Sequence, residues 1–355
     1  MQTGYDVQIR LDTLCLLHVA GSSGPAGANP GGGQDGGTTQ PPEDDDDPAN
    51  QPPHSLGIIS LGESHQSGAS TSIPFVSASF YPDAMLTKRC STAVGSCQVT
   101  QAAKCTENKT STTGCNTDSY CTFDDQCSPV CKKTAVCTKT CKTDEVCKYD
   151  DATKKSSCVK PETFDAGPIA FSGTTTPITL YPPYKYETDA KGAPFLAGAE
   201  IQVQAQGATS AGFEAFDEKF TATTFLQTTP ALKDISGDVV FGTGSLPVAW
   251  APGKDRIYIT VSGLGGSATC RATDADGKFD VPREVLDTVI GKIAEGSTPN
   301  LTLSVSRSRK ETKKDKKAKG ELTSTQVIAD AWVDMVTMST ETQSFKGCSS
   351  GLSSC

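Results

Sequence analysis

Cysteine is the residue type with the most evident chemistry, because eleven of the chain's fifteen cysteines lie within residues 90–158. Thiols at this density either pair as disulfides or bind a metal ion. Structural zinc sites favour cysteines two to four residues apart, often with histidine. This block has two CxxxC pairs, no CxxC pair and no histidine. We therefore predict disulfides rather than zinc, in a chain that folds in an oxidising compartment.

The predicted disulfide connectivity is open, because spacing alone does not fix it. Eleven is an odd number, so one thiol of the block is free or pairs outside it. A ten-residue spacing repeats over residues 127–137 and 137–147. We expect Cys270, in a predicted strand, to bond Cys348, with a small loop closed by Cys348 and Cys355 as the alternative. The cysteines expected to form disulfides are Cys90, Cys97, Cys105, Cys115, Cys121, Cys127, Cys131, Cys137, Cys141, Cys147, Cys158, Cys270, Cys348 and Cys355.

Nucleophilic catalysis needs a base, and the chain has only three histidines. His18 and His54 fall in a leader and a linker, and His65 falls in a predicted loop. Residues 347–351 spell G-x-S-x-G, but they lack the strand-to-helix turn and the downstream histidine of a nucleophile elbow. We therefore predict no catalytic residue.

Asp274, Asp276 and Asp280 resemble the start of a calcium loop. An EF-hand needs an oxygen ligand at position 5 and a Glu at position 12, where this sequence has Lys278 and Val285. We favour a turn between strands that end near residue 273 and begin at residue 278, because Asp-Gly supplies positive φ. Calcium binding by the three aspartates is the alternative, and we predict no other metal and no cofactor.

Residues 307–319 are strongly basic. Such a run could dock phosphate, polysaccharide or a membrane surface. No aromatic residues are interleaved, so stacking on single-stranded nucleic acid is not expected. We predict a mobile loop between two strands.

Composition narrows the class of protein further. The 355 residues are 36% hydrophobic and 6% aromatic, with a formal net charge of −9. The negative charge argues against nucleic acid and anionic lipid as partners. No run approaches the roughly 18 apolar residues of a membrane span.

The N-terminal 55 residues predict no packed core. Residues 1–20 contain a short apolar stretch that suggests a degraded secretory signal, with a disordered terminus as the alternative. Ser22 stands where a bacterial lipoprotein has its lipidated cysteine. Residues 21–55 are rich in Gly, Pro and Asp and predict a disordered acidic linker.

Alternating apolar residues dominate the remainder outside the cysteine block and predict antiparallel strands. The strands are expected at residues 56–61, 73–80, 169–171, 178–180, 200–205, 256–261 and 301–306, with one long strand within 321–337. One helix is expected at residues 282–293, with Pro282 in its first turn and its apolar residues forming one stripe along the helix. The fold class is therefore mainly β: an antiparallel sandwich, Ig-like or jelly-roll-like, with one short helix.

Several short segments share a pattern with a known group of proteins. They are residues 57–60 (GIIS), 77–80 (SASF), 95–99 (GSCQV), 165–169 (DAGPI), 198–201 (GAEI), 246–250 (LPVAW) and 270–282. Together they resemble uncharacterised secreted lipoproteins of myxobacteria and related bacteria. That resemblance implies a lipid-anchored, β-rich domain interrupted by cysteines. Residues 121–158 are also similar in spacing to Dickkopf- or EGF-like modules.

The resemblance implies a discontinuous sandwich. Residues 56–104 would supply its first strands, 105–158 would form a core-poor disulfide knot, and 159–355 would supply the rest.

We expect a non-enzymatic structural or interaction module, secreted or at the bacterial cell surface. Its partner would be a protein or a surface glycan, and it would touch a membrane only through an N-terminal lipid anchor. One alternative is a carbohydrate-active or hydrolytic enzyme that uses Asp or Glu, and another is an inhibitor-like or toxin-like knot on a carrier domain.

Overall fold

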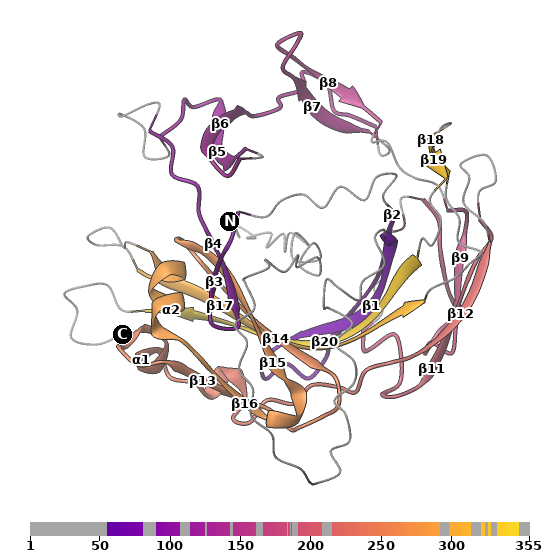
Figure 1. The fold of residues 1–355 in the computed structure, drawn as a ribbon, viewed down its shortest axis with the longest axis vertical. Helices are drawn as coiled ribbons and strands as arrows, with labels where there is room; N and C mark the ends of the chain where they lie inside the picture. The colour runs from indigo at the N-terminus through magenta and orange to yellow at the C-terminus, as the bar shows by residue number, and fades with distance from the viewer. Residues whose placement is uncertain are drawn as a thin grey trace, which may run out of the picture.

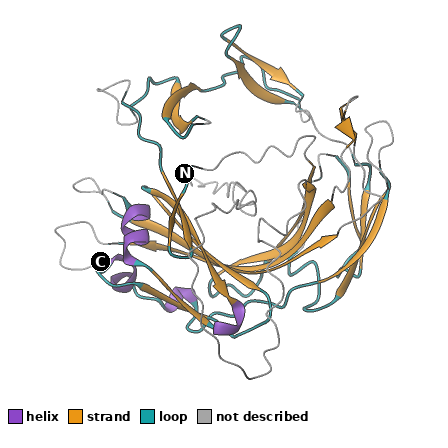
Figure 2. Ribbon diagram, in the orientation of Figure 1, coloured by secondary structure: helices purple, strands orange, loops and turns teal. Residues whose placement is uncertain are grey.

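The structure is a computed structural model of the chain. It describes residues 55–80, 90–106, 114–124, 126–142, 145–160, 166–182, 184, 186, 191–207, 215–291, 298–313, 321–323, 326–327 and 332–347. Within these ranges the chain is mostly β-strand, with two short α-helices (Figure 1 and Figure 2). Residues 1–54, which hold the predicted leader and nearly all of the linker, lie outside these ranges. So do residues 348–355, which include Cys348, Cys355 and most of the G-x-S-x-G sequence.

An eight-stranded sheet, called here the large sheet, forms the centre of the molecule in the order β2-β1-β20-β17-β14-β15-β4-β3. Four of its strands precede residues 105–158, called here the cysteine-rich segment, and four follow it. Their bounds are β1 (Ser55–Gln66), β2 (Ile73–Phe80), β3 (Thr92–Val94), β4 (Cys97–Gln101), β14 (Arg256–Gly263), β15 (Gly266–Thr273), β17 (Asn300–Lys313) and β20 (Trp332–Lys346).

Neighbouring strands of the large sheet are antiparallel except β1 and β20, which run parallel over almost their whole length. Side chains alternate between the two faces of a strand, so residues 301, 303 and 305 of β17 share one face. Leu301, Leu303 and Val305 are fully buried there. This face, called the inner face, carries the core.

A four-stranded sheet covers one half of the inner face. Its order is β10-β9-β11-β12, and its strands pack on β1, β2 and the first residues of β20. Ile59, Met335, Phe195 and Ile201 lie in this first core without solvent exposure. The strands are β9 (Ile169–Ser172), β10 (Ile178–Leu180), β11 (Glu200–Ala205) and β12 (Phe216–Thr221).

The other half of the inner face packs against α2 (Arg283–Ile290) and the two-stranded sheet of β13 (Leu246–Ala249) and β16 (Lys278–Val281). Pro282 precedes the helix, and Val285, Leu286 and Val289 form its buried stripe. The helix ends at Gly291, whose φ of 72° suits a residue without Cβ. The short helices α1 (Gly237–Phe241), η3 (Leu232–Asp234) and η4 (Asp274–Asp276) complete this side.

The cysteine-rich segment forms two hairpins that stand apart from the large sheet in Figure 1. The first pairs β5 (Ser119–Phe123) with β6 (Pro129–Lys133), and the second pairs β7 (Val146–Asp150) with β8 (Lys155–Val159). Neither hairpin contributes to the two cores.

The mainly β fold class predicted from the sequence is confirmed, with its disulfide-rich region. Two details differ. The β1–β20 contact makes the large sheet mixed rather than purely antiparallel. The single strand expected within residues 321–337 is wrong, because β18 (Glu321–Thr323) and β19 (Gln326–Val327) pair with each other before β20 begins. Neither described helix has the length and apolarity needed to span a bilayer.

Candidate functional site in the polar seam and the stapled hairpins

A strip of polar side chains separates the two cores on the inner face of the large sheet. Along β20, Val333 and Met335 belong to the first core and Phe345 to the second. Between them the alternation continues with polar residues that are buried all the same. We call this strip the polar seam; its members are Glu63, Arg307, Thr337, Ser339 and Glu341.

The segment of residues 222–234, which follows β12, crosses the inner face along the polar seam. Much of this crossing segment is irregular, and only some of its amides bond neighbouring backbone, as that of Thr229 bonds the carbonyl of Ala249. Side chains of β20 accept hydrogen bonds from other amides of the segment. The amide of Thr223 donates to Oγ1 of Thr337 over 2.8 Å, and that of Leu226 donates to Oγ of Ser339 over 2.9 Å. The polar residues of β20 therefore hold a loop over the sheet.

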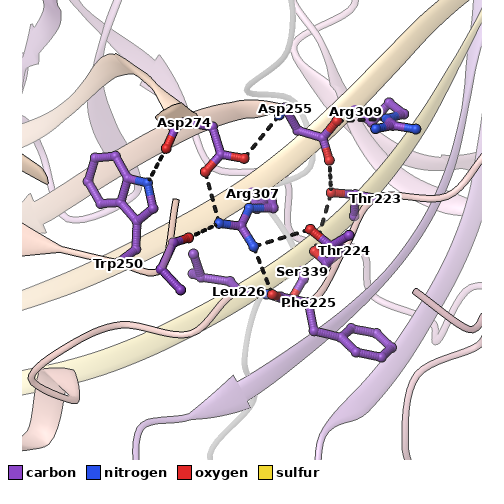
Figure 3. Close-up of polar contacts among 11 residues, drawn as sticks. Thr223, Thr224, Phe225, Leu226, Trp250, Asp255, Asp274, Arg307, Arg309 and Ser339 are labelled. Atoms are coloured by element: carbon purple, nitrogen blue, oxygen red, sulfur yellow. Dashed lines mark hydrogen bonds and ion pairs between the residues drawn. The ribbon is translucent and has the colours of Figure 1, made fainter. Parts of the chain in front are cut away.

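Arg307 is the most buried cation of the seam (Figure 3). Its Nη2 lies 2.8 Å from Oδ1 of Asp274, and the two side chains are 4% and 0% exposed. Nη1 donates to the carbonyl of Phe225 over 2.9 Å and to Oγ1 of Thr224, and Nη2 also donates to the carbonyl of Ala251. The guanidinium therefore joins β17 to the crossing segment and to the loop after β13.

Asp274 connects that ion pair to the second core. Its Oδ2 accepts the amide of Asp255 over 3.0 Å, and its carbonyl accepts Nε1 of Trp250 over 3.0 Å. Asp255 in turn accepts a hydrogen bond from the Thr223 hydroxyl and forms an ion pair with Arg309 at 2.7 Å. Both carboxylates are thus committed to internal partners (Figure 3).

Glu341 of β20 is a second buried carboxylate of the seam, and it lies beside the end of β1. Glu341 accepts hydrogen bonds from the hydroxyls of Ser67 and Thr228 and from the amide of Leu232. Burial raises the pKa of Glu341, but these hydrogen bonds outweigh it, so the pKa is lowered from its ordinary 4.5. Glu341 therefore stays ionised and anchors the far end of the crossing segment.

His65 is the titratable group of this region that water can reach. Its register partner on β20 is Glu341, and its Nδ1 lies 3.3 Å from Oε2 of Glu63. The hydrogen bond to Glu63 raises the pKa of His65 above 6.5, burial opposes this, and the charges of Glu63 and Glu341 add to it. The two buried carboxylates therefore favour the protonated form of the imidazole.

This arrangement differs from a hydrolytic triad. In a triad the nucleophile's hydroxyl bonds the histidine. Here Ser339 donates to Glu63 and Ser67 donates to Glu341. In the described part of the chain His65 bonds Glu63 and no hydroxyl. The polar side chains of the seam hold the crossing segment in place.

The prediction that His65 lies in a loop is wrong. β1 continues through Gln66, so His65 stands on a paired strand. Sequence reasoning ended the strand at residue 61 because the polar Glu63 and His65 interrupt the apolar pattern. The signal that was available is the period of two, which Leu61, Glu63 and His65 keep.

The turn predicted at Asp274 is present, because β15 ends at Thr273, β16 begins at Lys278 and Gly277 has a φ of 67°. The calcium alternative does not fit the geometry. Arg307 and the Asp255 amide bond both carboxylate oxygens of Asp274, whereas Asp276 and Asp280 are exposed.

The loop predicted for the basic run is wrong for its first residues. β17 extends through Lys313, and Arg307 and Arg309 are bonded inside the fold. Lys310, on the opposite face of the strand, forms an ion pair with the buried Asp334 at 3.3 Å. Residues 314–319 lie outside the described ranges. A single sequence shows these charges but not the aspartates that meet them.

All eleven cysteines of the block are bonded. The disulfides are Cys90–Cys127, Cys97–Cys270, Cys105–Cys121, Cys115–Cys131, Cys137–Cys147 and Cys141–Cys158. One cysteine of the block does pair outside it, but the expected bond between Cys270 and Cys348 is wrong. Cys270 faces Cys97 in register across β15 and β4, and both are fully buried.

The two hairpins share one disulfide pattern. In the first, Cys121 and Cys131 face each other across β5 and β6, and each bonds an earlier cysteine. In the second, Cys147 and Cys158 do the same across β7 and β8. With Cys127 of the first turn set aside, since it bonds Cys90, both units bond the first cysteine to the third and the second to the fourth. We call them the stapled hairpins. The ten-residue spacing seen in the sequence crosses their boundary and is not the structural repeat.

Two groups of three thiols lie within 4.8 Å of one another among the described residues, and all six thiols belong to these disulfides. No family model, curated protein or solved structure matches this chain.

Proposed function

We propose that this chain is a non-enzymatic interaction module of the bacterial cell envelope or the secreted space. It presents the stapled hairpins from a β-rich carrier, and its partner is a protein or a surface glycan. The resemblance to secreted lipoproteins supports that location, with membrane contact only through a lipid anchor.

The disulfides support the compartment. The stapled hairpins bury no side chain in either core, so crosslinks stand in for a core. Such crosslinks persist in oxidising surroundings and are reduced in the cytosol. A disulfide-rich β protein is therefore compatible with export.

The observation that carries the proposal is the exposure of large apolar side chains on the stapled hairpins. Tyr120, Val136 and Val146 are 51%, 69% and 49% exposed. Tyr120 and Val146 hold equivalent positions, each directly before the cysteine of the first strand of its hairpin. Rigid, exposed apolar groups bind a partner at a low cost in conformational entropy.

The carboxylates of the seam do not favour the enzyme alternative. Glu63 and Glu341 lie on neighbouring strands, but each is only 4% exposed. Glycoside cleavage needs two carboxyl groups on either side of a bound sugar. Both seam carboxylates accept hydrogen bonds from serines instead.

Site-specific photocrosslinking tests the proposal. The full chain carries p-benzoylphenylalanine at position 120, or at the matched control Tyr181, which is 64% exposed outside the hairpins. Each is irradiated with envelope preparations from the encoding organism. We expect a discrete adduct from position 120 that does not form when the chain is reduced before irradiation, and none from position 181.

Identical adducts from both positions, or no adduct, would contradict the proposed contact surface. Turnover of chromogenic glycosides or esters that is lost in Glu63→Gln and Glu341→Gln would contradict the non-enzymatic assignment. Tight binding by the hairpin segment that blocks another enzyme would favour the inhibitor-like alternative.

A further inference from the structure

The face of the large sheet opposite the cores, called the outer face, carries an ordered array of hydroxyl groups. Three consecutive register pairs of β17 and β20 are composed only of Ser and Thr: Thr302 with Ser344, Ser304 with Thr342, and Ser306 with Thr340. Each pair is joined by a side-chain hydrogen bond, at 3.2, 3.0 and 2.9 Å. We call these six residues the hydroxyl array.

The array continues onto the neighbouring strands. On β14, Thr260 is in register with Ser304, and it bonds Thr269 of β15 at 3.3 Å. Strands lie about 4.8 Å apart and successive rows about 7 Å apart, so hydroxyls recur on a regular grid. Tyr258 lies beside Ser306 and supplies an aromatic ring at the edge of the grid.

The described elements that pack on the large sheet do so through the inner face, where both cores lie. In Figure 1, α2, β13, β16, β11 and β12 surround the large sheet from outside, so the array lies on the concave side. Ser344 is exposed, Thr340 is 9% exposed and the other four are half-buried. The array therefore faces away from the core.

The hydroxyls keep hydrogen-bonding capacity. A hydroxyl has one donor and two lone pairs, so a bonded pair retains a donor and several acceptors. The next residue of β17 on this face, Ser308, has a buried Oγ without a hydrogen-bond partner in the described part of the chain. A buried hydroxyl in that state is costly unless an outside group bonds it.

Charge selects the class of ligand. The three register pairs themselves contain no charged side chain, and the charged residues Arg256 and Arg271 of the same face lie to one side of them, beside Ser308 and Tyr258. The net charge of −9 disfavours polyanions. Neutral sugars offer matching donors and acceptors, and their C–H faces pack on aromatic rings such as Tyr258. We infer that the outer face binds a neutral polysaccharide chain across the hydroxyl array.

This inference goes beyond the proposed function, because it adds a second surface, on the large sheet and separate from the stapled hairpins. Affinity electrophoresis of the full chain through gels containing dextran, pullulan or laminarin tests it, with polygalacturonate as the acidic comparison. We expect retardation by at least one neutral polysaccharide. Thr342→Val should weaken it about threefold to tenfold, because it removes one hydroxyl at nearly constant shape.

Tyr258→Leu should weaken retardation to a similar degree, since it keeps bulk and loses the ring. Thr179→Val is the matched control, because Thr179 is exposed on β10 away from the array. Unfolding midpoints confirm that each variant folds. Retardation by no neutral polysaccharide, by polygalacturonate alone, or equally in Thr342→Val and the control would overturn the inference.

The two proposals fail separately. New reducing ends after incubation with the polysaccharide would refute the non-enzymatic function and leave the binding surface intact. Loss of the position 120 crosslink with retained polysaccharide binding would refute only the role of the hairpins.

Discussion

Arg307 and Asp274 form an ion pair from which water is almost excluded, with Nη2 2.8 Å from Oδ1 and exposed fractions of 4% and 0%. The pair lies between the two cores, where β17, the crossing segment and the turn before β16 meet. A pair in this position stabilises the fold only while both charges are present.

Arg307→Met should lower the free energy of unfolding by about 3–5 kcal/mol, because it leaves the Asp274 carboxylate buried without a counter-charge. Denaturant unfolding with intact disulfides measures it. Lys219→Met is the control, since the Lys219–Glu200 pair has a similar distance of 2.7 Å but is 59% and 64% exposed. It should leave the free energy of unfolding nearly unchanged, because water screens the exposed pair. Equal losses in both variants would show that burial of the pair is not important.

Ser339→Ala should cost about 1–3 kcal/mol, because Ser339 accepts the Leu226 amide and donates to Glu63. Hydrogen exchange should show faster exchange at Leu226 and its neighbours in the crossing segment. Ser344→Ala, on the same strand but exposed, should change stability by less than about 0.5 kcal/mol. Unchanged exchange at Leu226 would refute the anchoring role of the seam.

The stability of the fold should fall as pH rises through the neutral range. The pKa of His65 is raised above 6.5, first by its hydrogen bond to Glu63. A raised pKa adds stability that is complete below pH 6.5 and is lost as pH passes the raised value. The lowered pKa of Glu341 adds stability above pH 4.5 that is lost as pH falls. Unfolding midpoints against pH measure both trends, and His65→Gln should remove the neutral one. A neutral-range slope that persists in His65→Gln would assign it to another group.

The disulfides should be reduced in two stages. Cys97 and Cys270 are fully buried in the second core, whereas the stapled hairpins hold their cysteines mostly half-buried. A reductant must reach the sulfur it attacks. Limited reduction followed by alkylation should therefore label hairpin cysteines first and Cys97 last, with the sheet still folded. Early labelling of Cys270 would contradict the packing around it.

Much of the fold could be predicted because alternation is a local signal. In the strand at residues 200–205 and the helix after Pro282, the spacing of apolar residues alone identifies the buried face. The cysteine block also indicated a crosslinked segment without a core. These features depend on neighbours within a few residues.

The polar seam could not be predicted, because its partners are far apart in sequence. Arg307 lies in a basic run and looks solvated until Asp274, 33 residues away, is placed beside it. Glu341 looks like a surface residue until Leu232, 109 residues away, donates its amide. The parallel pairing of β1 with β20 likewise joins the two ends of the described chain.

Non-reducing peptide mapping of the purified chain is the most direct test of the stapled architecture. We predict crosslinked peptides for Cys97–Cys270 and for the two matching sets, Cys105–Cys121 with Cys115–Cys131 and Cys137–Cys147 with Cys141–Cys158. Free thiols throughout the block, a bound metal ion in their place, or a different pairing in the two hairpins would contradict it.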